Sequence, residues 1–186
     1  MSHTLAAWAL KPHRDGEVAL LDRLEVEIVR TAPLLWHFRF GGAGDMTRIR
    51  FPTLDTSSRR DGLWKRTCAE FFLMDPGGSY CEFNFSPSTQ WAAYRFDSYR
   101  SGMKELDLKS EPRIDFTLMP DAFALSAVVD LTGVFEPQAQ NLRMGLASVI
   151  EDANGRISYW ALAHPPGKPD FHHADSFVGL LSDNVD

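Results

Sequence analysis

The sequence is poor in the features that mark several common protein classes. It has only two cysteines, no run that approaches the roughly 18 apolar residues of a membrane span, and no excess of basic residues. The formal net charge of −6 argues against a phosphate backbone as the main partner, so we expect neither a nucleic-acid nor a membrane partner. Residues 1–10 lack the basic front and apolar core of an export signal, which predicts a cytoplasmic protein.

The two cysteines, Cys68 and Cys81, fall in segments expected to be neighbouring strands. A disulfide between them is therefore geometrically conceivable. A cytoplasmic setting and burial on a strand favour two reduced thiols instead, and we expect no disulfide.

Strands dominate the pattern of the chain. No amphipathic helix of three turns is present, and 5 Trp, 4 Tyr and 13 Phe favour strands. An Asn154-Gly155 pair between two alternating runs is the strongest short hairpin signal. Eight or more strands without a helix predict a single all-β domain, residues 1–186, built as a two-sheet β-sandwich or a barrel. Runs of period two or of apolar residues place the strands at 18–30, 34–40, 63–73, 80–85, 90–96, 113–119, 122–131, 142–151, 156–163 and 176–181.

The stretch 63–96 is the most informative, because its strands mix aromatic and ionisable side chains. Side chains alternate along a strand, so Tyr80, Glu82 and Asn84 share one face and the intervening Cys81 and Phe83 the other. A carboxylate and an amide flanked by aromatic rings suit a polar, ring-shaped ligand such as a sugar. They equally suit an ordinary solvated sheet.

Three segments carry a resemblance to a known family. They read LW..TCAEFFL within 63–73, EFNFSP…WAAYRF within 82–96, and SYWALAHP..KPDFH within 158–172. Together they resemble the DOMON-like proteins, which are related to family-nine carbohydrate-binding modules, over nearly the whole chain. The resemblance implies a jelly-roll-like β-sandwich whose characterised relatives bind sugars or haem without catalysing a reaction.

The resemblance also implies particular site residues. Sugar-binding relatives place a tryptophan before a strand and a glutamate six residues later, which matches Trp64 and Glu70, and an arginine on a following strand, which matches Arg95. Trp160 and Phe171 are the options for their second stacking aromatic. Haem-binding relatives use a methionine and a histidine, for which the chain offers Met103, Met144 and His164.

Each of these residues has an alternative role. Trp64 fits a position in the core as well as one that stacks on a sugar ring. Glu70 lies among apolar neighbours and needs a partner or a proton, so it fits an ion pair with Arg95 that ties strands together. Glu70 and Glu82 would form a hydrolytic acid pair if they flanked a glycosidic bond. The hairpin register decides whether Glu70 lies beside Phe83 or Asn84, and the sequence leaves it open.

A histidine-rich segment near the carboxyl end suggests two further readings. His164, Asp170, His172, His173 and Asp175 fall within twelve residues, and these side chains suit zinc or copper. The spacing is looser than that of common zinc sites, and no metal site is assigned. The favoured alternative is that Phe171 fills the core while the histidines bond backbone groups of the loop.

We therefore expect a non-catalytic module that binds a small molecule, most plausibly a saccharide, with no cofactor and with haem as the alternative ligand. The other class of function that the residues allow is a structural or protein-interaction domain, in which side chains would close the face that bears Glu70. The expected ligand-binding residues are Trp64, Glu70, Glu82, Asn84, Arg95, Trp160, His164, Phe171 and His172.

Overall fold

The computed structural model describes residues 3–14, 20–135 and 142–181, and in these ranges the chain folds almost entirely into strands. Three short 3-10 helices and no α-helix accompany twelve strands there, which confirms the all-β prediction. The 3-10 helices are η1 (Met46–Arg48), η2 (Leu63–Lys65) and η3 (Ala174–Ser176). The strands are β1 (His3–Pro12), β2 (Arg23–Ala32), β3 (Leu35–Ala43), β4 (Cys68–Met74), β5 (Tyr80–Phe85), β6 (Trp91–Phe96), β7 (Lys104–Glu105), β8 (Arg113–Leu118), β9 (Ala122–Asp130), β10 (Leu142–Glu151), β11 (Ile157–Ala161) and β12 (Gly179–Leu181).

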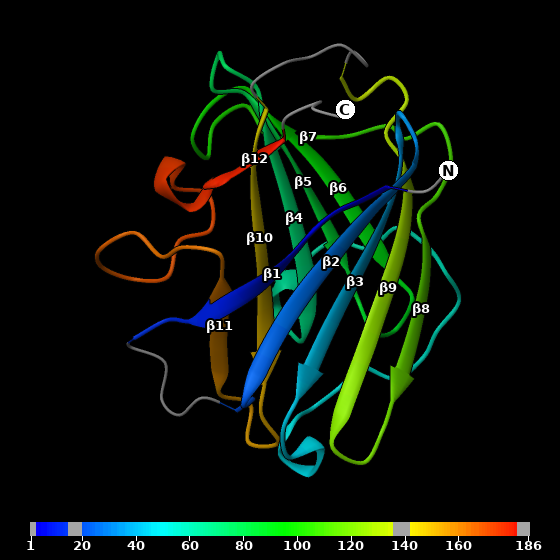
Figure 1. Cartoon of the computed structure of the whole chain (residues 1–186), viewed down its shortest axis with the longest axis vertical. Coiled ribbons are helices and arrows are strands. Elements are labelled where there is room, and N and C mark those ends of the chain that lie inside the picture. Colours follow the sequence, from blue (N-terminus) through cyan, green and yellow to red (C-terminus); the bar gives the residue numbers. More distant parts are fainter. Residues whose placement is uncertain (1–2, 15–19, 136–141, 182–186) are drawn as a thin grey trace.

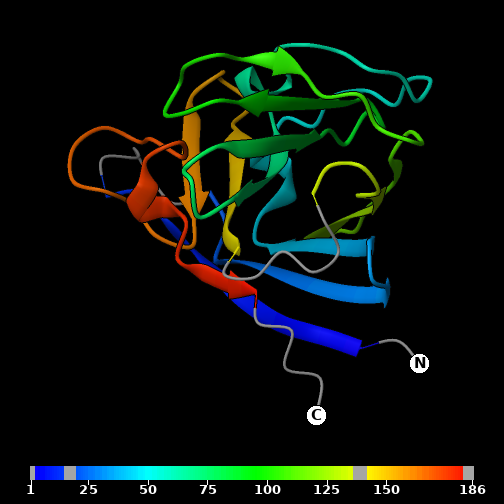
Figure 2. The same ribbon diagram turned by 90° about the horizontal axis from the view of Figure 1, so that it is seen from above.

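The strands form two antiparallel layers of a β-sandwich (Figure 1). One layer has the order β1-β2-β3-β9-β8, and the other has the order β7-β6-β5-β4-β10-β11, with β12 beside the first residues of β10. The layers meet at one edge, because Lys11 and Pro12 at the end of β1 pair with Ala161 and Trp160 of β11. Seen from above in Figure 2, the two layers face each other across the core.

Aromatic and aliphatic side chains fill the space between the layers. The rings of Phe38 on β3 and Phe71 on β4 lie 4.6 Å apart between centroids and join the two layers directly. Trp36 and Trp91 are also buried. Every second residue of β2 and β9 points into this core, which is the alternation that burying one face of a sheet requires.

Strands β4 and β5 differ, because both of their faces are buried. Their outer face carries a second apolar cluster that includes Phe72, Tyr80 and Phe177. Helix η2 and the segment 162–178 contribute residues to this cluster, including Leu63, Phe171 and Phe177. These segments cover the margins of a sheet face that would otherwise be exposed to water. The candidate site lies on this face.

The strand predictions hold with local exceptions. Residues 80–85 and 142–151 form strands with the predicted limits, and the Asn154-Gly155 turn joins β10 to β11 as a hairpin. The prediction of a strand from residue 63 is wrong for 63–67, because Gly62 adopts a left-handed conformation (φ 78°) and starts η2. Strand β1 was not predicted, and residues 18–19 of the expected first strand lie outside the described residues.

Cys68 and Cys81 are both free and buried, as expected. Cys81 belongs to the core between the layers, whereas Cys68 belongs to the outer cluster, so the two thiols lie on opposite faces of their sheet. In the described part of the chain no helix is long and apolar enough to cross a membrane.

Candidate functional site

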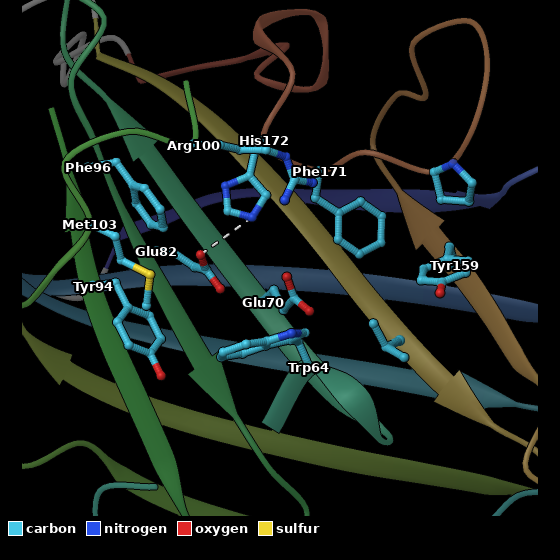
Figure 3. Close-up of a pocket in the computed structure, with 12 residues that line it drawn as sticks. Trp64, Glu70, Glu82, Tyr94, Phe96, Arg100, Met103, Tyr159, Phe171 and His172 are labelled. Atoms are coloured by element: carbon cyan, nitrogen blue, oxygen red, sulfur yellow. Dashed lines mark ion pairs between the residues drawn. The ribbon is translucent and has the colours of Figure 1, made fainter. Parts of the chain in front are cut away.

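A pocket of about 410 Å³ opens on the outer face of the β7-to-β11 layer (Figure 3). Strands β4, β5, β6, β10 and β11 contribute to it, with η2 and the segments around residues 100–103 and 169–172 at its margins. Its position follows from the covering of this face described above, since the covering elements leave the middle of the sheet uncovered. The lining residues are Trp64, Glu70, Glu82, Tyr94, Phe96, Arg100, Met103, Val149, Tyr159, Pro169, Phe171 and His172.

Two glutamates from adjacent strands form the polar part of the pocket. Glu70 on β4 pairs with Asn84 on β5, and Glu82 pairs with Phe72. This register resolves the question that the sequence leaves open, because it places Glu70 beside Asn84 rather than Phe83. Glu70 and Glu82 are consequently diagonal neighbours on one face of the sheet, and both carboxyl groups reach the same space.

Glu70 is a buried acid without a hydrogen-bond partner at one of its oxygens. Only 3% of the residue is exposed, and Oε1 has no partner among the described residues. Burial, and secondarily the nearby charge of Glu82, raise the pKa of Glu70 well above its ordinary value. Burial therefore favours the protonated form of the carboxyl group, which presents an unpaired oxygen close to the pocket.

Glu82 is held more firmly. Asn84 Nδ2 donates a 2.7 Å hydrogen bond to Glu82 Oε1, within a residue that is 4% exposed. Burial raises the pKa of Glu82 to about 7, although the Asn84 hydrogen bond and the charge of Arg100 both act to lower it. Glu82 thus titrates near neutral pH, and Asn84, which is fully buried beneath it, acts as a positioning residue.

His172 faces Glu82 from the segment that covers the pocket. Burial is the main cause that lowers the pKa of His172 to about 4, so the ring is neutral near pH 7. Its Nδ1 lies 2.8 Å from Tyr80 Oη, which accepts a hydrogen bond from the backbone N–H of Arg100. We assign the Tyr80 proton to the His172 Nδ1 bond, which leaves an N–H on Nε2, 3.7 Å from Glu82 Oε2.

The cation at the pocket is Arg100. Its guanidinium Nη2 donates to Asp170 Oδ1 at 2.8 Å, while Tyr99 Oη donates to Asp170 Oδ2 at 2.6 Å. These contacts attach the segment around residue 100 to the segment that bears His172. They also occupy the guanidinium, so the main charge partner of Arg100 is Asp170 rather than either pocket glutamate.

The prediction that Arg95 meets Glu70 is wrong. Arg95 pairs with Cys81, whereas its neighbour Tyr94 pairs with Glu82, so alternation directs Arg95 to the face opposite the pocket glutamates. It is exposed there, and the expected Glu70–Arg95 ion pair does not form.

Aromatic rings form the walls of the pocket. Trp64 on η2 is partly exposed and packs edge-on against Tyr94, with 5.9 Å between the ring centroids. On the other side Tyr159 and Phe171 pack together at 6.0 Å. Phe96 adds a further ring beside Tyr94 (Figure 3). The pocket therefore offers ring faces around its two carboxyl groups.

One of the two residues expected to be the second stacking aromatic, Trp160, lies outside the pocket lining. Trp160 is 2% exposed and belongs to the core between the layers, where its Nε1 donates to Ser158 Oγ at 3.2 Å. Its strand neighbour Tyr159 points into the pocket instead. Phe171, the other option, lines the pocket and is also buried in the outer apolar cluster, as the sequence predicts for a residue that fills a core.

The histidines and methionines do not converge on one centre. His164 Nε2 lies 2.8 Å from the Lys11 carbonyl, outside the pocket lining, and His173 Nδ1 accepts a hydrogen bond from the backbone of Asp175. Met144 is buried in the core, so of the candidate haem ligands only Met103 lines the pocket. Within the described ranges, no three His, Cys, Asp or Glu side chains are grouped as metal ligands would be.

The sequence prediction missed several lining residues. Tyr94 and Phe96 could have been predicted from the pattern, because a short β5–β6 hairpin in register places Tyr94 opposite Glu82. Arg100 gave no such signal, because it lies in a polar connection whose course depends on the rest of the fold, and Met103 in the same connection was considered only as a haem ligand.

Comparisons with known proteins give structural likenesses at low sequence identity. No family model matches the chain, and no curated protein does either. A candidate carbohydrate-binding protein from Bacteroides uniformis has 11% identity over 94% of this chain and 84% of its own, with a TM-score of 0.62. A family-nine carbohydrate-binding module from Caldicellulosiruptor kristjanssonii, solved in complex with cellotriose, has 12% identity over 95% of this chain and 85% of its own, with a TM-score of 0.53. These likenesses show the β-sandwich fold.

Proposed function

We propose that the chain is a non-catalytic carbohydrate-binding module whose ligand occupies the pocket between Trp64 and Phe171. The observation that carries the proposal is the buried carboxyl group of Glu70, whose Oε1 lacks a partner within the described structure while the group lines an open pocket. A buried polar atom without a hydrogen bond is costly, and a ligand hydroxyl would supply that bond. The partly exposed indole of Trp64 adds a flat apolar surface of the kind that stacks on a sugar ring.

The similar proteins support the same class of ligand. One is a candidate carbohydrate-binding protein, and the other was solved with cellotriose. The resemblance of segments 63–73, 82–96 and 158–172 to DOMON-like proteins agrees with them, and Trp64 and Glu70 are the two residues that this resemblance assigns to sugar binding.

The arrangement of the acids favours binding over catalysis. Glycoside hydrolysis needs one carboxyl group on each side of the scissile bond. Glu70 and Glu82 instead come from adjacent strands and approach from the same side of the pocket. A sugar above them would meet both acids on one edge, which suits recognition of hydroxyl groups.

A saccharide panel tests the proposal. Thermal unfolding of the purified protein is measured with mono- and disaccharides, because a ligand that binds only the folded state stabilises it, by about 2.7 kcal/mol at a concentration 100 times the Kd. We expect at least one saccharide to raise the melting temperature of the wild type and of the control Trp8→Ala, which removes a partly buried indole outside the pocket. Trp64→Ala should lose the effect. A panel without any shift at millimolar saccharide, or a Trp64→Ala variant that responds fully, would refute the proposal.

A further inference from the structure

Two acids and one cation line the pocket, and the cation is already paired. Glu70 and Glu82 contribute two acids, and Arg100 is the one cation among the lining residues that the structure describes, because His172 is neutral. Asp170 already holds the Arg100 guanidinium at 2.8 Å. The two acids therefore face the pocket without a cation of their own, and the Oε1 of Glu70 has no partner in the described part of the chain.

The walls around these acids are aromatic. Trp64, Tyr94 and Phe96 line one side and Phe171 and Tyr159 the other. The face of an aromatic ring attracts cations, most strongly for tryptophan and most strongly where water is excluded. Aromatic walls around two acids form a receptor for a positively charged group. A neutral hydroxyl would use only the hydrogen-bonding capacity of the acids.

We propose that the pocket selects a sugar that carries a protonated amine, with the ammonium group between the carboxyl groups of Glu70 and Glu82 and within the aromatic walls. This inference rests on the proposed function and names the class of saccharide. An ammonium donates three hydrogen bonds, which matches the free Oε1 of Glu70 and the Oε2 of Glu82, and its positive charge would favour the ionised forms of both acids. A metal ion fits less well, because no third ligand accompanies the two acids among the described residues.

Binding of an ammonium group should change the protonation of Glu70 and Glu82. In the free protein burial raises the pKa of Glu70 and so favours its protonated form, and Glu82, with a pKa of about 7, is partly protonated near pH 7. A cation placed between them favours both charged forms, so amine binding should release a proton, which a neutral sugar would not do. The other titratable or charged groups that face this pair from the surrounding elements are Asp61, Cys68, Tyr80, Tyr94, Arg100, Tyr159, Asp170 and His172.

Calorimetric titration separates this inference from the proposed function. Glucosamine, N-acetylglucosamine, glucose and the sugar-free ammonium choline are titrated near neutral pH in two buffers of different ionisation enthalpy. We expect glucosamine to bind at least about tenfold more tightly than the two neutral sugars, and to release up to about one proton. Choline should bind more weakly than glucosamine, because it carries the positive charge but lacks both the ring hydroxyls and the N–H donors of a protonated amine.

Variants assign the effect to the acids. Glu70→Gln and Glu82→Gln keep the shape and a hydrogen-bonding oxygen but cannot ionise, so each should lower the ratio of glucosamine affinity to glucose affinity. Glu25→Gln, at an exposed carboxylate on β2, should change nothing.

The outcomes differ in what they overturn. Neutral sugars that bind as tightly as glucosamine, or a preference that survives both variants, would overturn the inference and leave the proposed function intact. Failure of every sugar to bind would overturn both, and so would binding of choline alone.

Discussion

Replacing Glu82 with glutamine should change how the stability of the protein depends on pH. The pKa of Glu82 is about 7 in the folded protein and 4.5 in a free side chain. The folded state therefore binds the proton more tightly than the unfolded state. The stabilisation from Glu82 is complete below pH 4.5 and is lost as the pH rises through 7.

The size of the effect follows from the two values. Each pKa unit corresponds to 1.36 kcal/mol, so the loss from Glu82 is about 3 kcal/mol between pH 4.5 and pH 7. His172 acts in the opposite direction, because its pKa falls from 6.5 to about 4 on folding. Its neutral form is favoured in the folded state, so its contribution is lost as the pH falls through 4 and gained as the pH rises to 6.5. The two contributions oppose each other in the wild type over most of this range.

Glu82→Gln removes the contribution of Glu82 to the pH dependence and keeps that of His172. The free energy of unfolding of the variant, relative to the wild type, should rise by about 3 kcal/mol between pH 4.5 and pH 8, since the variant keeps the His172 contribution and no longer loses that of Glu82. Removing the neighbouring charge also eases the ionisation of Glu70, which acts in the same direction. Glutamine still offers an oxygen to Asn84 Nδ2, so the fold should survive.

Urea unfolding at several pH values measures this difference. Wild type, Glu82→Gln and the exposed control Glu25→Gln are unfolded from pH 4.5 to pH 8, and the midpoints are compared at constant slope. The control should follow the wild type. A Glu82→Gln curve parallel to the wild type, within about 1 kcal/mol at every pH, would show that Glu82 is an ordinary ionised carboxylate and would refute the reasoning.

Four other substitutions test separate parts of the account. Trp64→Ala should weaken saccharide binding by roughly tenfold or more in calorimetry, with little change in the urea midpoint, because the indole is partly exposed and forms a wall of the pocket; an unchanged Kd would contradict its role. Arg95→Ala should leave the Kd unchanged while Arg100→Ala weakens binding, because only Arg100 reaches the pocket; the reverse order would show that the sheet register is wrong. Phe38→Ala should cost about 3–5 kcal/mol of unfolding free energy, because the ring is 1% exposed and packs on Phe71 between the layers; a loss below about 1 kcal/mol in urea unfolding would contradict the packing.

Much of the fold was predictable because burial of one sheet face imposes a period of two. The limits of β5 and β10 and the Asn154-Gly155 hairpin followed from that pattern. Strand β1 was not predicted, since the stretch 3–12 was considered only as a possible export signal.

The site was predictable only in part, because it depends on relations between segments. Glu70, Glu82, Trp64, Phe171 and His172 were identified from the sequence and line one pocket. Arg95 was the wrong arginine, because the face to which it points depends on the β5–β6 register. A shift of that register by one residue moves each side chain to the opposite face.

The same limit explains the tryptophan. Trp160 and Tyr159 are adjacent on β11, so alternation lets only one of them point into the pocket, and the resemblance offered Trp160 with Phe171 but not Tyr159. Arg100 reaches the pocket through its bond to Asp170, a residue seventy positions away, which no local pattern reveals.

The most direct test of the central claim is the ¹H–¹⁵N spectrum of the tryptophan indoles during a saccharide titration. The chain has five tryptophans, and of these Trp64 alone lines the pocket among the residues that the structure describes. With the Trp64 signal assigned through Trp64→Phe, the account predicts that this indole resonance shifts in a saturable manner while the buried Trp36, Trp91 and Trp160 signals stay in place. A Trp64 signal that does not move when saccharide binds, or a response centred on another indole, would contradict the claim that this pocket is the binding site.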